Sequence, residues 1–117
     1  MTDTPIDGDP VTRVLEHDIT FGAPKAVGRV QMRRITMAPG VASGLHVHNG
    51  PVFGTVLRGS VLFGAAGEPV RVLTAGDVFF EAEGAPIAHF DAQDEGVEFV
   101  GVFPLAGDQE PGIGFPE

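Results

Sequence analysis

Hydrophobic residues in this chain fall in short stretches separated by glycine- and proline-containing segments such as Ala38-Pro39-Gly40 and Ala65-Ala66-Gly67. No long stretch shows a 3.6-residue helical repeat with a capped start, so the pattern favours strands over helices. The predicted strands are Arg29–Met37, Gly44–His48, Val52–Leu57, Ser60–Phe63, Val70–Leu73, Asp77–Glu81, Ile87–Asp91 and Val97–Phe103, with an additional early strand near Thr12–Glu16.

Many short strands in a chain of 117 residues predict a sandwich or a barrel, because a closed arrangement hides the strand edges. We expect residues 1–10 to be a flexible N-terminus, 11–105 to form the β-domain and 106–117 to be a tail. The tail sequence disfavours regular structure, and we expect it either to pack Ile113 and Phe115 across the domain or a partner subunit, or to be disordered.

Composition and charge narrow the class of protein. The length suits one domain, and 43% hydrophobic residues are enough for one core. The net charge of −9 would repel nucleic-acid backbones and anionic lipid headgroups, so neither is an expected partner. No apolar stretch is long enough to cross a membrane, and the acidic start does not resemble a secretory signal. A cytoplasmic location is therefore the default expectation.

The chain contains no cysteine, tyrosine or tryptophan. Disulfides, thiolate metal sites, iron–sulfur clusters and cysteine nucleophiles are thereby excluded. Acid–base chemistry would have to come from His, Asp, Glu or Lys side chains, or from a metal-bound water.

The pair His46 and His48 is the sharpest chemical feature of the sequence. Alternate residues of a strand point to the same face, so the two imidazoles could converge on one ion. Imidazole suits zinc, iron, copper and nickel. The alternatives are two surface histidines, or a pair that is hydrogen-bonded to carboxylates.

The flanks of this pair, from Gly40 to Gln93, resemble the two sequence motifs of cupins. Gly40 precedes His46 by five intervening residues, and Gly59 has the expected spacing after the pair. Gly76 and Gly84 match the second motif, in which Ala82 replaces the usual proline. The resemblance implies an all-β, small cupin-type β-barrel, jelly-roll-like (a double-stranded β-helix), with a metal ion at its mouth.

Two departures from these motifs concern the ligands. The acidic residue of the first motif falls at Val52, which cannot bind metal, and the histidine of the second falls at Ile87. A two-residue insertion after Gly84 would bring His89 to the ligand position and Gln93 to the usual asparagine position. The resemblance then implies His46, His48 and His89 as metal ligands. The alternative is that His89 lies further along the strand and binds nothing.

Other candidate site residues are less specific. Glu81 could orient a ligand histidine or be an ordinary carboxylate at a strand end. Arg58, with Arg34, could anchor an anionic substrate group or lie on the surface. His17 lies in a charged context typical of a solvated histidine. Apolar residues expected on the inward face are Met32, Phe53, Val56, Phe63, Phe79 and Phe103.

The segment Gly50–Gly54 reads much like the one that follows the histidines in diketone-cleaving and dihydroxyacetophenone-type dioxygenases. This resemblance implies a metal-dependent oxygenase for a small enolisable or phenolic substrate. Fe(II) is the expected ion, with Zn, Ni, Mn or Cu as alternatives. A non-redox metal-dependent cyclase, isomerase or lyase, and a non-catalytic small-molecule-binding cupin, are the competing hypotheses. We also expect a homodimer, from the resemblance and from the small size of the chain.

Overall fold

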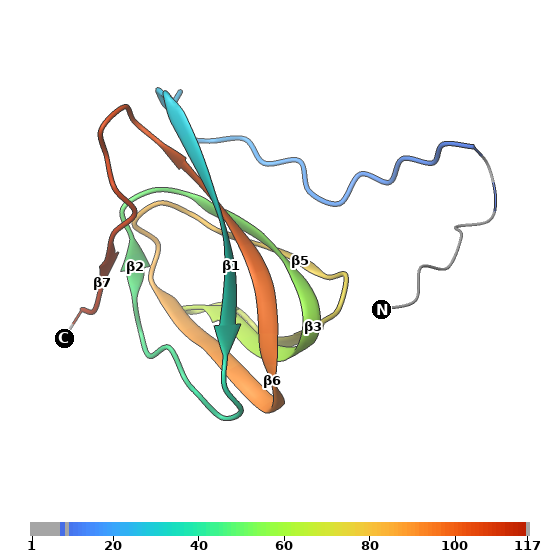
Figure 1. Ribbon diagram of the computed structural model, residues 1–117. Helices are drawn as coiled ribbons and strands as arrows, with labels where there is room; N and C mark the ends of the chain where they lie inside the picture. Colours follow the sequence, from blue (N-terminus) through green and yellow to red (C-terminus); the bar gives the residue numbers. More distant parts are fainter. Residues whose placement is uncertain (1–7, 9, 117) are drawn as a thin grey trace.

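The computed structural model describes residues 8 and 10–116, and every regular element in that part of the chain is a β-strand (Figure 1). No helix that could cross a membrane occurs among these residues. The strands are β1 (Arg29–Met37), β2 (Val47–His48), β3 (Val52–Ala65), β4 (Arg71–Thr74), β5 (Val78–Glu81), β6 (Ile87–Leu105) and β7 (Ile113–Gly114). The prediction of a flexible segment 1–10 falls largely outside the described residues.

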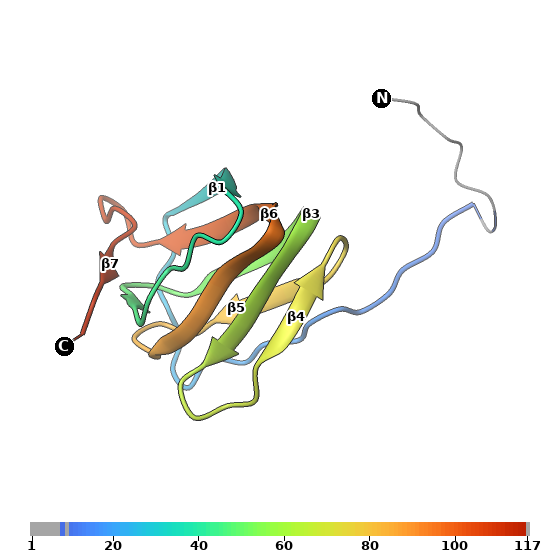
Figure 2. The same cartoon turned by 90° about the horizontal axis from the view of Figure 1, so that it is seen from below.

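Two long strands, β3 and β6, form the centre of a five-stranded antiparallel sheet (Figure 2). β1 pairs with the second half of β6 over its whole length. The opposite edge of β3 pairs with β5 near its start and with β4 near its end. β2 and β7 form a separate two-stranded sheet. The all-β prediction is confirmed, but in the described part of the chain the two sheets do not close into one hydrogen-bonded barrel.

The long central strands merge segments that the sequence pattern separates. β3 joins the predicted Val52–Leu57 and Ser60–Phe63, and β6 joins Ile87–Asp91 and Val97–Phe103. The sheet register shifts on both sides of Gly59, so this glycine marks a bulge within a bent strand and not a turn. A hairpin and a bulge share the same glycine signal, which is why the sequence alone divides the strand here.

The close approach of the two bent strands explains why this position must be glycine. Gly59 has a φ of +76°, in the left-handed region that favours glycine. A Cβ atom at residue 59 would lie 2.1 Å from the carbonyl oxygen of Gly96 on β6, which is far too close. Gly59 therefore lets both strands bend at one point without losing their pairing.

The core lies on one face of the bent sheet and is rich in phenylalanine. Phe63, Phe79, Phe90 and Phe99 form a connected cluster with ring centroids 4.8 to 6.1 Å apart. Most pairs adopt edge-to-face geometry, which favours aromatic contacts. Buried valine, leucine and alanine side chains complete this core.

Residues 10–28 contain no strand, so the expected strand at Thr12–Glu16 is wrong. The first part of this segment extends away from the sheets (Figure 1), and Val11, Val14 and Leu15 are highly exposed. Exposed apolar side chains of this kind are candidates for contact with a second copy. The homodimer stays a prediction.

Replacing Leu73 with Ala tests the core. Leu73 on β4 is 0% exposed, so its removal should lower the free energy of unfolding by about 2–5 kcal/mol through lost burial and a cavity. Urea unfolding measures the change. Val72→Ala is the matched control, since Val72 is 52% exposed on the opposite face and should change stability little. Equal effects of the two substitutions would contradict the assignment of faces.

Candidate metal site

Three side chains from two separate parts of the chain converge inside the fold. His46 immediately precedes β2, His48 ends β2, and Glu81 ends β5. One potential ligand atom from each lies within 4.8 Å of the other two. His46 and Glu81 are buried and His48 is partly buried. This group combines two imidazoles and one carboxylate, all of them ligand types that divalent transition metals use.

The spacing of the donor atoms suits a metal ion. Glu81 Oε2 lies 3.5 Å from His46 Nε2 and 3.0 Å from His48 Nε2. Two donors that each bind one ion at about 2.1 Å, with ordinary angles between them, are about 3.0 to 3.4 Å apart. The side chains therefore need little rearrangement to hold an ion.

The hydrogen bonding around His46 and Glu81 supports the same interpretation. His46 Nδ1 lies 2.8 Å from the carbonyl oxygen of Gly44, which can only accept, so Nδ1 carries the proton. In the neutral ring, Nε2 then presents a lone pair toward Glu81. Oε2 of Glu81 is buried and has no well-aligned hydrogen-bond partner among residues 8 and 10–116. Because a lone pair and a carboxylate oxygen repel each other, a cation or a proton is needed between them.

Without a metal ion, a proton on His46 meets part of this need. The Glu81 carboxylate raises the pKa of His46 above its ordinary value of 6.5, although burial opposes this. For Glu81, burial is the largest influence and raises the pKa. The close approach and the charge of His46 and His48 together outweigh it, so the pKa of Glu81 is lowered from 4.5. The carboxylate therefore stays ionised although it is buried.

Strand register explains how a carboxylate reaches the histidines although Val52 replaces the acidic residue of the first motif. Val52 on β3 is directly opposite Glu81 on β5. Opposite residues of an antiparallel pair share a face, so Glu81 occupies the face on which residue 52 lies. The sequence alone indicated Glu81 as an orienting partner or an ordinary carboxylate, and not as a candidate ligand. Its same-face spacing with the core residue Phe79 is the signal that could have found it.

The structure does not bring His89 to this group. His89 is opposite Gly64, and its side chain is 45% exposed. Its Nδ1 atom lies 2.9 Å from Asp91 Oδ2. The inward position belongs to the next residue, Phe90, which is opposite Phe63 in the core. Ile87 is buried and forms an isolated bridge with His46. Pairing with β3 thus turns His89 to the outer face.

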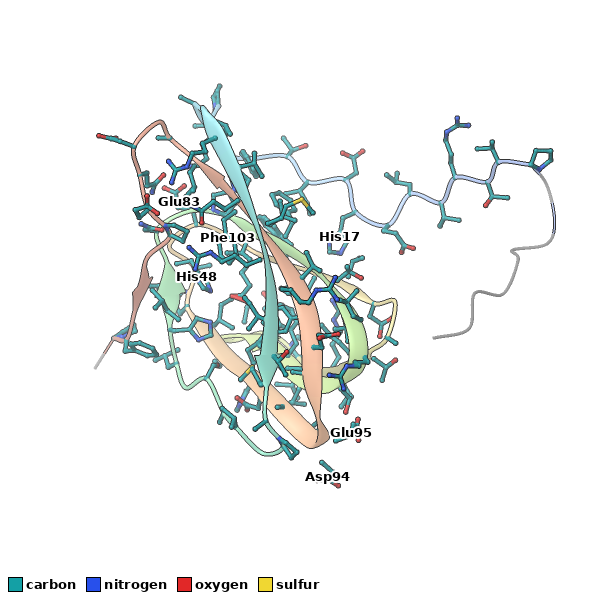
Figure 3. The ribbon with its side chains drawn as sticks, viewed as in Figure 1. His17, His48, Glu83, Asp94, Glu95 and Phe103 are labelled. Carbon is teal, nitrogen blue, oxygen red and sulfur yellow. The ribbon has the colours of Figure 1, made fainter. Side chains whose placement is uncertain are left out.

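A cavity of about 190 Å³ adjoins the three candidate ligands. Its walls are apolar except for Ser43 and the ligands themselves. In Figure 3, His48 and Phe103 lie on the same side of the molecule near β2 and β7, whereas His17 lies on the exposed N-terminal segment. The lining residues are Ile35, Met37, Ser43, His46, His48, Val52, Phe79, Glu81, Phe90, Phe99, Phe103 and Ile113.

Two of the expected pocket residues, Phe79 and Phe103, line this cavity. Val56 and Phe63 belong to the core, Phe53 stacks near Phe21 and Phe80, and Met32 is 72% exposed.

The predicted substrate-anchoring arginines lie outside the cavity. Arg58 is beside the bulge at Gly59, where its side chain is 71% exposed and its Nε lies 3.3 Å from Glu98 Oε1. Arg34 is also exposed and pairs with the same carboxylate at 3.8 Å. Neither guanidinium lines the cavity that contains the histidines.

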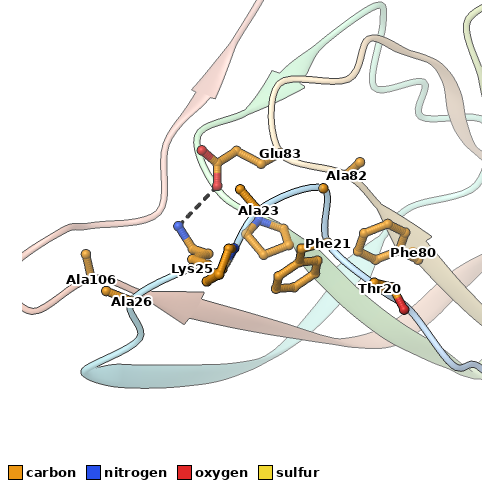
Figure 4. A pocket seen from close by; sticks show the side chains of 12 residues that line it. Thr20, Phe21, Ala23, Lys25, Ala26, Phe80, Ala82, Glu83 and Ala106 are labelled. Carbon is orange, nitrogen blue, oxygen red and sulfur yellow. Dashed lines mark hydrogen bonds and ion pairs between the residues drawn. The ribbon is translucent and has the colours of Figure 1, made fainter.

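A larger pocket of about 580 Å³ lies elsewhere, between residues 20–26 and the outer face of β5 (Figure 4). Phe80 and Ala82 line it, whereas Phe79 and Glu81 face the metal-site cavity, as expected for alternate residues of a strand. Lys25 forms an ion pair with Glu83 at its edge. The two cavities share no lining residue, so the larger one is separate from the candidate metal site.

Comparison with known proteins places this geometry in a family. The sequence-family model of the cupin domain matches residues 33–103, which is more than half of the chain. The chain belongs to the cupin family. The predicted jelly-roll-like cupin fold is thereby confirmed. No protein of curated function matches the sequence.

Solved structures agree with the cupin assignment. An oxalate oxidase in complex with the substrate analogue glycolate is 30% identical, with a TM-score of 0.62, over 74% of this chain and 45% of its own. A cupin-like protein from Thermotoga maritima is 28% identical, with a TM-score of 0.58, over 64% of this chain and 56% of its own. DMSP lyase DddQ from Ruegeria pomeroyi is 23% identical, with a TM-score of 0.62, over 70% of this chain and 41% of its own. At this identity the similarity shows the fold alone.

This cupin therefore spans less than half the length of the oxalate oxidase and lyase chains that it resembles. Their similarity supports the fold of this chain and leaves its activity to be argued from its own site.

Metal binding tests the ligand set. Calorimetric titration with Zn²⁺ should show one ion per chain, and His48→Ala or Glu81→Gln should weaken binding by about 100-fold, since even residues that only orient a ligand contribute about 10- to 100-fold. His89→Ala is the matched control and should bind as tightly as the wild type. If His89→Ala alone lost the ion, the side chain would have to turn inward when metal binds.

The protonated His46–Glu81 pair predicts a pH window of stability in the metal-free protein. Since the pKa of His46 is raised, its contribution is complete below 6.5 and is lost as the pH rises through the folded-state pKa. Since the pKa of Glu81 is lowered, its contribution is present above 4.5 and is lost as the pH falls through the folded-state pKa.

The difference in Tm between wild type and Glu81→Gln should therefore be largest between pH 4.5 and 6.5. Thermal unfolding with a chelator present, across and beyond this window, measures it. A Tm difference that does not vary with pH would refute the pairing.

Proposed function

We propose that this cupin is a metal-dependent oxygenase that acts on a small enolisable or phenolic compound, with Fe(II) held by His46, His48 and Glu81. The observation that carries the proposal is the buried group of two imidazoles and one carboxylate beside an apolar cavity. Two histidines and one carboxylate with open coordination positions are typical of non-haem Fe(II) oxygenases. When bound, Fe(II) supplies a Lewis acid and a centre for one-electron chemistry with dioxygen.

Charge balance favours a substrate that binds as a monoanion. One carboxylate and two neutral imidazoles leave a divalent ion with one uncompensated positive charge. An enolate or a phenolate neutralises that charge, whereas a dianion would leave a net negative charge among apolar side chains. In the described part of the chain, no Arg or Lys lines the cavity to compensate for it. This argues against a dicarboxylate substrate, despite the 30% identity with an oxalate oxidase.

Size and polarity point to a small molecule. A volume of about 190 Å³ corresponds to about six water molecules in the liquid. Phe79, Phe90, Phe99 and Phe103 contribute much of the wall. These rings suit the apolar part of a diketone or phenolic ketone, and they keep water away from the reacting atoms. Exclusion of water also strengthens the electrostatic attraction between an ion and an anionic substrate.

The protein itself supplies orientation. Gly44 fixes the ring of His46, so that Nε2 faces Glu81, and β3–β5 pairing holds Glu81 beside both rings. Since these side chains are buried or partly buried, their rotamers are restricted before any substrate binds. The candidate ligands are thus arranged in advance for one ion and leave the apolar side open.

Oxygen uptake by the iron-loaded protein tests the proposal. The full chain is loaded with Fe(II) under anaerobic conditions, and oxygen consumption is measured with a panel of diketones and phenolic ketones. We expect oxygen uptake with at least one compound. In Glu81→Gln, assayed at the same added iron, the rate of uptake should fall by about 100-fold. Arg58→Ala, which changes an exposed side chain outside the cavity, should keep the wild-type rate.

The same panel separates the other hypotheses. Product formation by the zinc-loaded protein without oxygen consumption would support Lewis-acid chemistry in place of oxygenation, because zinc does not change its oxidation state. Binding of panel compounds without turnover by either metal form would support a non-catalytic binding protein. Full iron occupancy with no oxygen uptake would count against the oxygenase.

A further inference from the structure

The C-terminal residues Gln109–Gly114, here called the strap, cover one side of the metal-site cavity. Within the strap, β7 lies beside β2 (Figure 1), and the strand register sets Ile113 directly opposite His48. Opposite residues of an antiparallel pair share a face, and Ile113 accordingly lines the cavity together with His48. The strap therefore contributes one apolar side chain to the wall beside a candidate metal ligand.

Asn49 contacts the strap through all of its polar groups, and an ion pair between Arg29 Nη2 on β1 and Glu110 Oε1, at 3.0 Å, adds a further tie. The backbone N–H of Asn49 donates to the carbonyl of Gly112 at 3.1 Å, and its own carbonyl accepts from Gln109 Nε2 at 3.0 Å. Its side-chain Nδ2 donates to the carbonyl of Glu110 at 2.9 Å, and Oδ1 accepts from the N–H of Gly112 at 2.8 Å. Because Asn49 follows His48 directly, the strap is fastened next to the metal site.

Gly112 fits this arrangement through its lack of a side chain. A Cβ atom at residue 112 would lie 2.9 Å from Asn49 Nδ2 and 3.2 Å from Cγ, so it would push the amide away. Asn49 and Gly112 together form what we call the latch. Substituting either residue should weaken the same contacts by different means.

The strap has the properties of a segment that opens easily. Its strand pairing covers only two residues, and Ile113 is half exposed. Phe115, just beyond it, is exposed and does not line the cavity. Segments with few buried apolar contacts, held by hydrogen bonds at the surface, open locally at lower cost than the core. The Phe-rich side of the cavity lies in the rigid sheet, so the strap side is the part able to move.

We propose that Ile113 limits the size of the substrate that the cavity accepts, and that the latch of Asn49 and Gly112 controls how often the strap opens to admit it. Asn49 is a positioning residue in this scheme, since it acts through Ile113. The inference rests on the metal site and the proposed function, and it identifies the residues that select among small enolisable compounds. Opening of a loop that covers a site commonly limits entry and release.

The rate of metal extraction tests the latch without relying on catalysis. The zinc-loaded full chain is mixed with excess EDTA, and loss of zinc is followed over time. Asn49→Ala removes two side-chain hydrogen bonds, so the extraction rate should rise roughly tenfold. Gly112→Ala should give a similar increase, whereas Phe115→Ala should match the wild type. Thermal unfolding of each variant verifies that it is folded.

Ligand preference tests Ile113. The Co(II)-loaded protein is titrated with 2,4-pentanedione and with its larger phenyl homologue 1-phenyl-1,3-butanedione, and the visible spectrum of cobalt reports binding. Ile113→Ala should shift the ratio of the two Kd values roughly tenfold toward the larger diketone, a typical effect of removing side-chain bulk from a pocket. Phe115→Ala should leave the ratio unchanged. The same ratio in all three proteins would overturn the role of Ile113.

The outcomes separate this inference from the proposed function. Faster extraction and a shifted preference, without oxygen uptake by the iron form, would uphold the strap and refute the oxygenase. Oxygen uptake with unchanged extraction and preference would uphold the oxygenase and refute the strap. Failure of the wild-type protein to bind zinc or cobalt would overturn both.

Discussion

A buried carboxylate between two imidazoles is the constraint on which the rest of this structure depends. Glu81 is only 4% exposed, and burying an ionised carboxylate is costly unless positive charge lies beside it. His46 and His48 meet that requirement when one of them is protonated, or when an ion takes the place of the proton. The pairing of β5 with β3, and the position of β2 beside them, are needed to keep these three groups together.

The phenylalanine core and the metal site share the same face of the sheet, and this gives the cavity two unlike sides. Phe79, Phe90 and Phe99 belong both to the packed core and to the cavity wall, so that side resists deformation. The opposite side consists of a short two-stranded ladder fastened by polar contacts to Asn49. The sheet therefore provides the rigid side of the cavity, and the strap provides the side through which access is proposed.

Much of the fold could be predicted because local patterns determine it. The bounds of β1 and the existence of β4 and β5 follow from apolar stretches between glycines, and His46 and His48 share a face because of strand alternation. The glycine spacings also indicated the cupin fold. The continuous course of β3 and β6 could not be predicted, because Gly59 gives the same local signal in a bulge as in a turn.

The remaining part of the site depends on contacts between residues distant in sequence. The role of Glu81 follows from its register with Val52, and the outward position of His89 follows from its pairing with Gly64. A shift of one residue in either pairing would reverse these orientations, and no local pattern sets that register. The position of Arg58 outside the cavity could not be predicted either, since the bulge at Gly59 changes the strand register beside it. Packing of Ile113 against the domain was one of two expectations from the sequence, but the pairing of β7 with β2 could not be predicted, because β7 is only two residues long.

The phenylalanine walls also determine how the cavity would withstand oxidising chemistry. The chain has no phenol, indole or thiol group, which are the side chains that lose an electron most readily. Apart from the candidate ligands themselves, the cavity residue most open to oxidation is Met37, whose thioether lies at the end of β1. Conversion of Met37 to its sulfoxide would place a polar group in an apolar wall, so oxidative damage at this residue would change the polarity of the cavity.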